Sequence, residues 1–128
     1  MANIGRKNLL EVVRLENHGA YLQGGWLGEI LLPNRYVPED CEAGDPLNVF
    51  IYLDSEDRYI ATTQTPKAQV GEVAYLQCIS VNQTGAFFDW GLPKDLLVPF
   101  SEQAKPMEEG KYYVAYVYID NSDRIVAS

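Results

Sequence analysis

The stretch TGAFFDWGLPKDLLVP, residues 84–99, decides the fold. It has the pattern of a strand, a glycine-containing corner and a second strand, because short apolar and aromatic runs are separated by Gly and Pro. Successive side chains of a strand point to opposite faces. We therefore expect Phe88 and Ala86 to face a core, while Phe87 is an exposed ring and Gly85 also faces outward.

A related stretch, HGAYLQGGWLGEILLP, occupies residues 18–33. Residues 4–62 align with residues 70–128 without a gap, and a repeat of this length indicates one small fold used twice. The identical positions favour residues that set backbone geometry, among them Gly19 and Gly85, Pro33 and Pro99, and Asp54 and Asp120.

Each repeat has the alternation and turn residues of five strands. In the first we predict strands at residues 9–15, 19–23, 29–32, 47–53 and 58–62. In the second we predict them at residues 72–81, 85–89, 95–98, 112–119 and 124–127. Closing such short strands into a barrel removes their edges. The sequence therefore predicts an all-β chain of two tandem five-stranded OB-fold barrels, with domains over residues 1–65 and 66–128.

The segments NRYVPEDCEAG and FSEQAKPMEEG connect the third and fourth strands of each repeat, and we expect a helical turn in both. Alternation in the fourth strands predicts inward faces formed by Leu47, Val49, Ile51 and Leu53, and by Tyr113, Ala115, Val117 and Ile119. The outward positions are then Phe50, Tyr52, Tyr116 and Tyr118. These rings either extend an aromatic platform or pack against neighbouring domains.

Composition narrows the function classes. The formal net charge is −8, with 10 basic and 18 acidic residues, so any nucleic-acid binding must be local. No apolar stretch is long enough to span a bilayer and no secretory signal is visible, so we expect a cytoplasmic protein without a membrane role. Cys41 and Cys78 lack metal-ligand spacing and are expected to be reduced, buried or half-buried thiols. We find no catalytic motif and expect neither enzyme activity, nor a metal, nor a cofactor.

The segments GAFFDWGLPKDLLVPFSE and DNSDRIVAS resemble the S1 RNA-binding domain. More narrowly, VFIYLDSEDRYIATT, PKAQVGEVAYLQ and GAFFDWGLPKDLLVPFSEQ resemble the bacterial conserved virulence factor B family, tandem S1 proteins implicated in RNA binding and in regulating virulence and RNA turnover. Family members continue into further C-terminal domains. The chain is thus expected to be the N-terminal two-domain part of such a protein.

The resemblance implies that single-stranded RNA, with single-stranded DNA as the alternative, crosses the outer face of the second and third strands beside the last hairpin. Exposed rings stack on bases there, and basic side chains follow the backbone. The residues carried over are Phe87, Asp120 and Arg124 in the second repeat, and Tyr21, His18, Asp54 and Arg58 in the first. A positive stripe formed by Arg6, Lys7, Arg14, Arg58, Lys67 or Arg124 beside exposed rings would support RNA binding, whereas an acidic face throughout would count against it.

Several of these residues have a structural alternative. The Asp and Arg of each final hairpin either contact a ligand or only brace the turn, and His18 is either a ligand contact or a neutral surface residue. Trp26 and Trp90 are either stacking tips or lids over a barrel end. The alternative function is a protein-interaction module, because OB barrels also serve as docking platforms and an acidic surface repels RNA.

Overall fold

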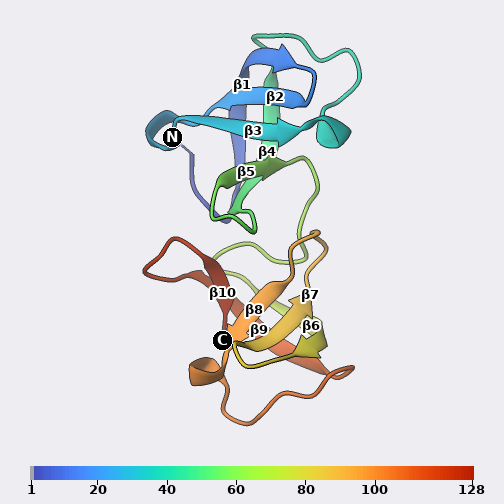
Figure 1. Ribbon diagram of the computed structural model, residues 1–128, viewed down its shortest axis with the longest axis vertical. Helices are drawn as coiled ribbons and strands as arrows, with labels where there is room; N and C mark the ends of the chain where they lie inside the picture. The colour runs from blue at the N-terminus through green and yellow to red at the C-terminus, as the bar shows by residue number, and fades with distance from the viewer. Residues whose placement is uncertain (1) are drawn as a thin grey trace. The chain divides into compact units, whose positions relative to one another are not determined.

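The computed structural model describes residues 2–128, which form two compact units, one up to Thr65 and the other Pro66–Ser128. Both units are built of strands, and three short 3-10 turns are the helical elements among the described residues (Figure 1). No helix of this part of the chain is long and apolar enough to cross a membrane.

The first unit is a closed barrel with the strand order β1-β2-β3-β5-β4. Its strands are β1 (Lys7–Glu16), β2 (Gly19–Gln23), β3 (Glu29–Pro33), β4 (Pro46–Leu53) and β5 (Tyr59–Thr62). The 3-10 turn η1 (Gly25–Leu27) lies between β2 and β3, and η2 (Asn34–Tyr36) follows β3. Neighbouring strands are antiparallel except β3 and β5, which pair in parallel at Leu31 and Ile60.

The second unit repeats this ring, with the order β10-β8-β7-β6-β9. Its strands are β6 (Val73–Val81), β7 (Gly85–Asp89), β8 (Leu96–Pro99), β9 (Tyr112–Ile119) and β10 (Ile125–Ala127), and η3 (Phe100–Glu102) follows β8. The predicted all-β class with two five-stranded barrels is confirmed, as are the helical turns after β3 and β8. The turn η1 was not predicted.

Each barrel has its own core on the face that alternation predicts. Val49 and Ile51 of β4 are fully buried in the first core, and Ala115 and Val117 of β9 are buried in the second unit. Phe88 is also fully buried and its ring meets Tyr113 edge to face, with the ring centroids 5.9 Å apart. The inward positions of the sequence pattern are therefore confirmed.

The outward rings of β4 do not reach solvent, which decides against one of the two alternatives that the sequence leaves for them. Phe50 and Tyr52 lie opposite the core-facing Val49 and Ile51, yet both are buried. Burial raises the pKa of Tyr52, and Tyr36 of η2 adds to the shift. Alternation gives the side of a strand on which a residue lies but not what covers that side. These two rings cannot form an exposed platform.

Gly19 and Gly85 begin β2 and β7, and both are buried although Gly85 was expected to face outward. A Cβ atom on Gly85 would lie 2.4 Å from the backbone oxygen of Val98, and one on Gly19 would lie 2.2 Å from that of Leu32. At both corners the next strand therefore passes too close for a side chain. Glycine occupies both repeat positions because the neighbouring strand leaves no room for a side chain.

We predict that Gly85→Ala destabilises the second barrel by about 1–3 kcal/mol, because the added methyl group must displace backbone. Gly44→Ala is the matched control. Its glycine also has positive φ, but a Cβ there meets nothing within 4 Å. Urea unfolding of the full chain measures both changes, and equal losses would contradict this account.

Candidate nucleic-acid interface

A β-bulge places Arg14 over Tyr21 in the first barrel. Alternation from the buried Leu10 and Val12 would point Arg14 into the core, but the register of β1 against β2 shifts between Val12 and Arg14. A bulge adds a residue and re-aims the side chains beyond it. Arg14 now pairs with Tyr21, and its guanidinium carbon lies 4.3 Å from the ring centroid, a cation–π distance.

Tyr21 also contacts His18, the only histidine of the chain. His18 Nε2 lies 2.6 Å from Tyr21 Oη, and the two rings meet edge to face with centroids 5.5 Å apart. His18 is exposed and Tyr21 is half-buried. The structure thus brings two predicted site residues together, with His18 orienting the phenol on which a base would stack.

The hairpin between β4 and β5 is braced by Asp54. Its Oδ1 accepts hydrogen bonds from the backbone N–H groups of Glu56 (2.8 Å) and Arg58 (3.0 Å), and its Oδ2 accepts one from Arg58 Nε (3.0 Å). Arg58 Nη2 also donates to Glu56 Oε2 at 2.6 Å. Burial alone would raise the pKa of Asp54, but these hydrogen bonds and the Arg58 charge outweigh it and lower that pKa. Asp54 therefore holds the turn and Arg58 together.

Three of the predicted residues of the first barrel line one open cavity of about 440 Å³ on the barrel's outer face, which is in the size range of small-ligand sites. The complete lining is Tyr21, Leu27, Glu29, Leu31, Asp54, Asp57, Arg58 and Tyr59. Four of these residues are aromatic or aliphatic, three are carboxylates and one is an arginine. The excess of carboxylates therefore favours hydrogen-bond donors over phosphate.

Sequence reasoning missed two residues of the candidate interface in the first barrel. Arg14 was counted only among the basic residues, and Glu29 was not considered. Arg14 donates from Nη1 to Glu29 Oε1 at 2.6 Å and from Nε to Glu16 Oε2 at 2.7 Å, and these hydrogen bonds raise its pKa. The bulge that brings them together has no clear signature in the sequence.

The second barrel presents Phe87 at the position of Tyr21. Phe87 is half-buried, neither sealed in the core nor fully exposed. It pairs with Ser80 of β6 on one side and Leu97 of β8 on the other, and Leu97 pairs in turn with Val126 of β10. The ring therefore lies on the outer face one strand away from the last hairpin.

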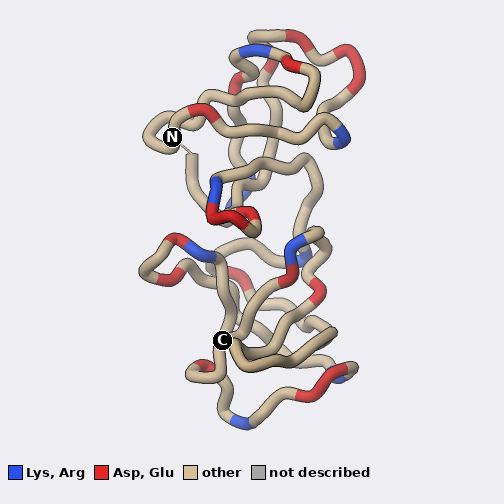
Figure 2. The backbone as a smooth tube through the Cα atoms, in the orientation of Figure 1, with Lys and Arg blue, Asp and Glu red and all other residues tan. Residues whose placement is uncertain are grey.

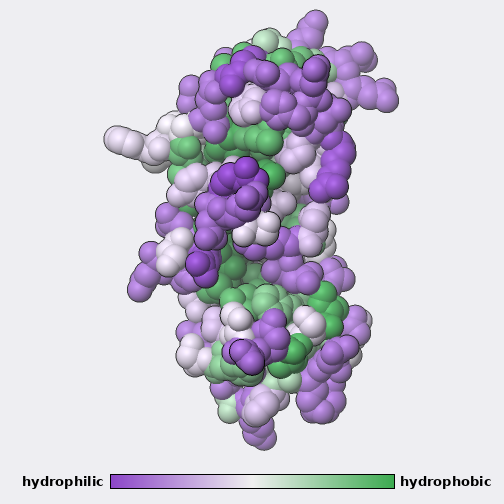
Figure 3. Space-filling view, in the orientation of Figure 1, coloured by the Kyte–Doolittle hydropathy of each residue, from purple (hydrophilic) through white to green (hydrophobic). Residues whose placement is uncertain are grey.

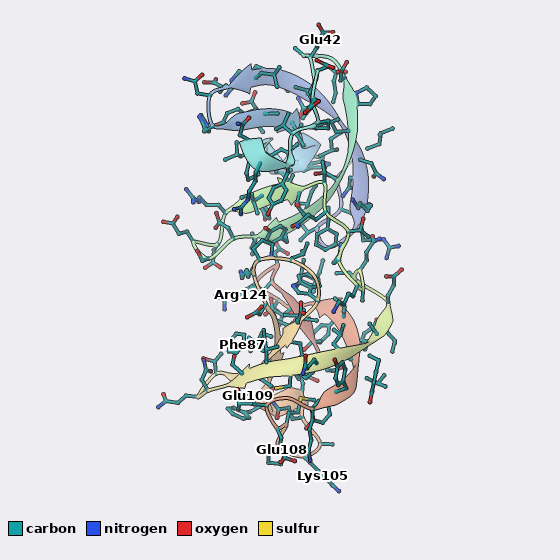
Figure 4. All side chains as sticks on the ribbon, turned by 90° about the vertical axis from the view of Figure 1, so that its right-hand side faces the viewer. Glu42, Phe87, Lys105, Glu108, Glu109 and Arg124 are labelled. Carbon is teal, nitrogen blue, oxygen red and sulfur yellow. The ribbon has the colours of Figure 1, made fainter. Side chains whose placement is uncertain are left out.

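That hairpin repeats the brace of the first barrel. Asp120 Oδ1 accepts from the backbone N–H groups of Ser122 (2.8 Å) and Arg124 (3.1 Å), and the Arg124 side chain is exposed. Figure 4 shows Phe87 and Arg124 in the same part of the second barrel, whereas Lys105 and Glu108 lie at its other end. Asp120 is thus a bracing residue. Phe87 and Arg124 are the candidate ligand contacts of the second barrel.

The two tryptophans differ. Trp90 is buried, and its indole N–H donates to the backbone oxygen of Lys94 at 2.6 Å, so it is not an exposed stacking tip. Trp26 in η1 is 84% exposed and is a candidate stacking tip. Of the two tryptophans, therefore, only Trp26 is exposed enough to stack on a base.

Basic residues do not form a continuous stripe within either barrel of residues 2–128, so the positive stripe that would support RNA binding is not seen there. They are scattered among acidic residues (Figure 2). Arg14 and Arg58 each touch two carboxylates, and Lys67 Nζ lies 3.7 Å from Asp89. Phosphate would have to compete with these carboxylates for the cations.

The described residues contain no group of three His, Cys, Asp or Glu side chains able to hold a metal ion. Cys41 is half-buried and Cys78 is buried, and neither forms a disulfide, as the sequence predicted. Burial raises the pKa of both thiols, which disfavours the reactive thiolate.

A family model described as the S1 domain matches residues 4–64 and, separately, residues 70–128. The chain belongs to the S1 domain family. Both S1 domains coincide with the two barrels, so the resemblance read from the GAFF and DNSDR segments is confirmed.

Relatives of these S1 domains are bacterial. Uncharacterized protein YitL of Bacillus subtilis is 34% identical over 106 residues, covering 82% of this chain and 35% of that protein. Conserved virulence factor B of Staphylococcus epidermidis is 28% identical over 129 residues, covering 95% of this chain and 43% of that protein. The chain therefore spans less than half the length of these relatives.

A solved structure shares the fold of both S1 domains. It is the crystal structure of a multidomain protein with nucleic acid binding domains from Streptococcus pneumoniae, with a TM-score of 0.81 and 19% sequence identity. The match covers 98% of this chain and 45% of that chain. At this identity the likeness establishes the fold alone.

We predict that Asp54→Asn lowers stability at pH 7 by about 1–3 kcal/mol, because a charge-assisted acceptor is lost. A carboxyl whose pKa is lowered by folding adds stability above its unfolded value of ~3.9, and this stability disappears as the pH falls through the lower folded value. The variant should therefore lose less stability than wild type between pH 5 and pH 2, as measured by urea unfolding. An acid dependence identical to that of wild type, or shared by Glu39→Gln, would refute this role.

Proposed function

We propose that the chain is a non-catalytic RNA-binding protein that binds single-stranded RNA on the outer faces of its two S1 domains. The observation that carries the proposal is the position of Phe87, half-exposed on the outer face and one strand from the hairpin that bears Arg124. A ring beside a guanidinium can stack on a base while the cation meets the backbone.

The contacts we propose are Phe87 and Arg124 in the second domain, and Tyr21, His18 and Arg58 in the first. Asp120 and Asp54 hold the hairpins that present the arginines. The family resemblance and the relatives' name support a role in post-transcriptional or virulence gene regulation in the cytoplasm. Single-stranded DNA offers the same bases and phosphates and is the alternative ligand.

We further infer that the second domain contributes more of the affinity. In the first domain the ring of Tyr21 has Arg14 over it, and Arg14 and Arg58 are held by Glu16, Glu29, Asp54 and Glu56. In the repeat alignment, Ser122 replaces Glu56 and Ser80 replaces Arg14. The residue paired with Phe87 on β6 is thus a serine and not an arginine, so no guanidinium from that position lies over the Phe87 ring.

We predict that Phe87→Ala weakens binding to a labelled, mixed-sequence single-stranded RNA by about 5- to 150-fold, the ~1–3 kcal/mol of one stacked base. Arg124→Ala should weaken binding and make it less dependent on salt. Fluorescence anisotropy at low salt measures both. Lys105→Ala is the matched control, since it removes a cation at the other end of the second barrel. No measurable RNA binding by wild type would refute the proposal.

We also predict that Glu29→Gln combined with Glu56→Gln strengthens RNA binding, because Arg14 and Arg58 each lose a competing carboxylate. The slope of log K against log salt should become steeper by about 0.7 for each additional phosphate that the arginines neutralise. Glu42→Gln removes one negative charge from a carboxylate that forms no ion pair with Arg14 or Arg58 in the described structure, and so controls for net charge. If Glu42→Gln raised the affinity by the same factor per charge removed, the gain would come from net charge and not from the two arginines.

A further inference from the structure

The outer face of β6 and β9 in the second barrel is an uncharged, largely apolar surface. It is formed by Val73, Tyr75 and Gln77 of β6 and by Tyr112, Val114 and Tyr116 of β9, which we call the β6–β9 face. Its three tyrosines and two valines are 45–67% exposed. Exposed apolar patches of this kind mark interaction sites more often than ordinary surface does. Figure 3 shows apolar side chains at the surface of this barrel.

The fold does not require this surface. In the repeat alignment, the corresponding positions of the first barrel are Lys7, Leu9, Glu11, Pro46, Asn48 and Phe50, of which two are charged and the last is buried. The same barrel can therefore be built with a charged face at these positions. The apolar character of the β6–β9 face belongs to the second barrel alone.

Nucleic acid is a poor occupant for this face. None of its six residues is basic, and Lys111, which precedes Tyr112, is paired with Glu108 at 2.7 Å. Phosphate binding draws its affinity from Lys and Arg. Tyrosine in an uncharged, apolar setting is instead typical of the centre of protein interfaces. The charge of the face thus favours a protein surface that is itself uncharged.

The arrangement of the rings is self-complementary. In the strand register, Tyr116 lies opposite Val73, Tyr75 opposite Val114, and Tyr112 opposite Gln77. Each pair thus joins one tyrosine and one smaller side chain. A twofold axis parallel to the strands and between them would lay every β6 residue over its register partner in a second copy. At the level of the backbone each tyrosine would then face Val or Gln of the other copy, and the stacked rings of Tyr75 and Tyr112, with centroids 5.4 Å apart, would lie across the axis. Interfaces between identical subunits need this kind of self-complementarity.

Charge restricts where two copies can meet. The chain carries a net charge of −8, so two copies repel each other over most of their surfaces. The β6–β9 face contains no carboxylate, and a second copy supplies the same uncharged aromatic surface. We propose that the β6–β9 face is the interface of a homodimer of this chain. The proposal is independent of RNA binding.

Sedimentation velocity of the full chain over a concentration range tests the proposal. We expect a reversible monomer–dimer equilibrium, and Tyr75→Ser with Tyr112→Ser should weaken it at least about tenfold. Leu9→Ser is the matched control, because Leu9 is the exposed counterpart of Tyr75 in the first barrel and should leave the equilibrium unchanged. A chain that is monomeric at every concentration, or a dimer that withstands the double substitution, would overturn the proposal.

A charge swap tests the register of the interface. Tyr75→Lys and Val114→Glu should each weaken the homodimer, because each places a charge against an apolar partner. When the two variants are mixed, Lys at position 75 of one copy meets Glu at position 114 of the other, while the second pair stays native. We expect heterodimers that exceed both homodimers. Folding of each variant is checked by circular dichroism, and failure of the mixture to associate would overturn the twofold arrangement.

Discussion

The close approach of two backbones at Gly19 and Gly85 is the constraint on which each barrel depends. At both corners the carbonyl of the following strand occupies the space of a side chain, so the sheet can curl tightly enough to close. Closure leaves no unpaired strand edge and fixes which residues face outward. The outward positions of Tyr21 and Phe87, two residues after these glycines, follow from the same corner.

Much of the fold could be predicted because the positions that are identical in the two repeats identify the residues that set backbone geometry. Strand periodicity placed Val49, Ile51, Ala115 and Val117 in the cores, and these assignments hold. It left open whether Phe50 and Tyr52 are exposed or packed, since a pattern of period two carries no information about what covers the outer face. It also missed the Arg14–Tyr21 contact, because a bulge changes the direction of a side chain without leaving a recognisable residue type.

The two barrels show how duplicated surfaces diverge while their frame stays constant. Asp54 and Asp120 hold equivalent hairpins with the same backbone hydrogen bonds, so the frame tolerates changes around them. The first barrel surrounds its arginines with carboxylates, and the second carries apolar residues where the first has Lys7 and Glu11. An acidic chain can in this way hold distinct binding properties on copies of one fold.

The parallel pairing of β3 with β5, and of β8 with β10, has a consequence for synthesis on the ribosome. Each barrel closes through its last strand, which meets the third strand at one register pair far away in sequence. Such non-local contacts slow folding, because a long loop must be closed before they are made. The N-terminal barrel can close only after the emerging chain has exposed Thr62, and until then its unfinished sheet is open to chaperones.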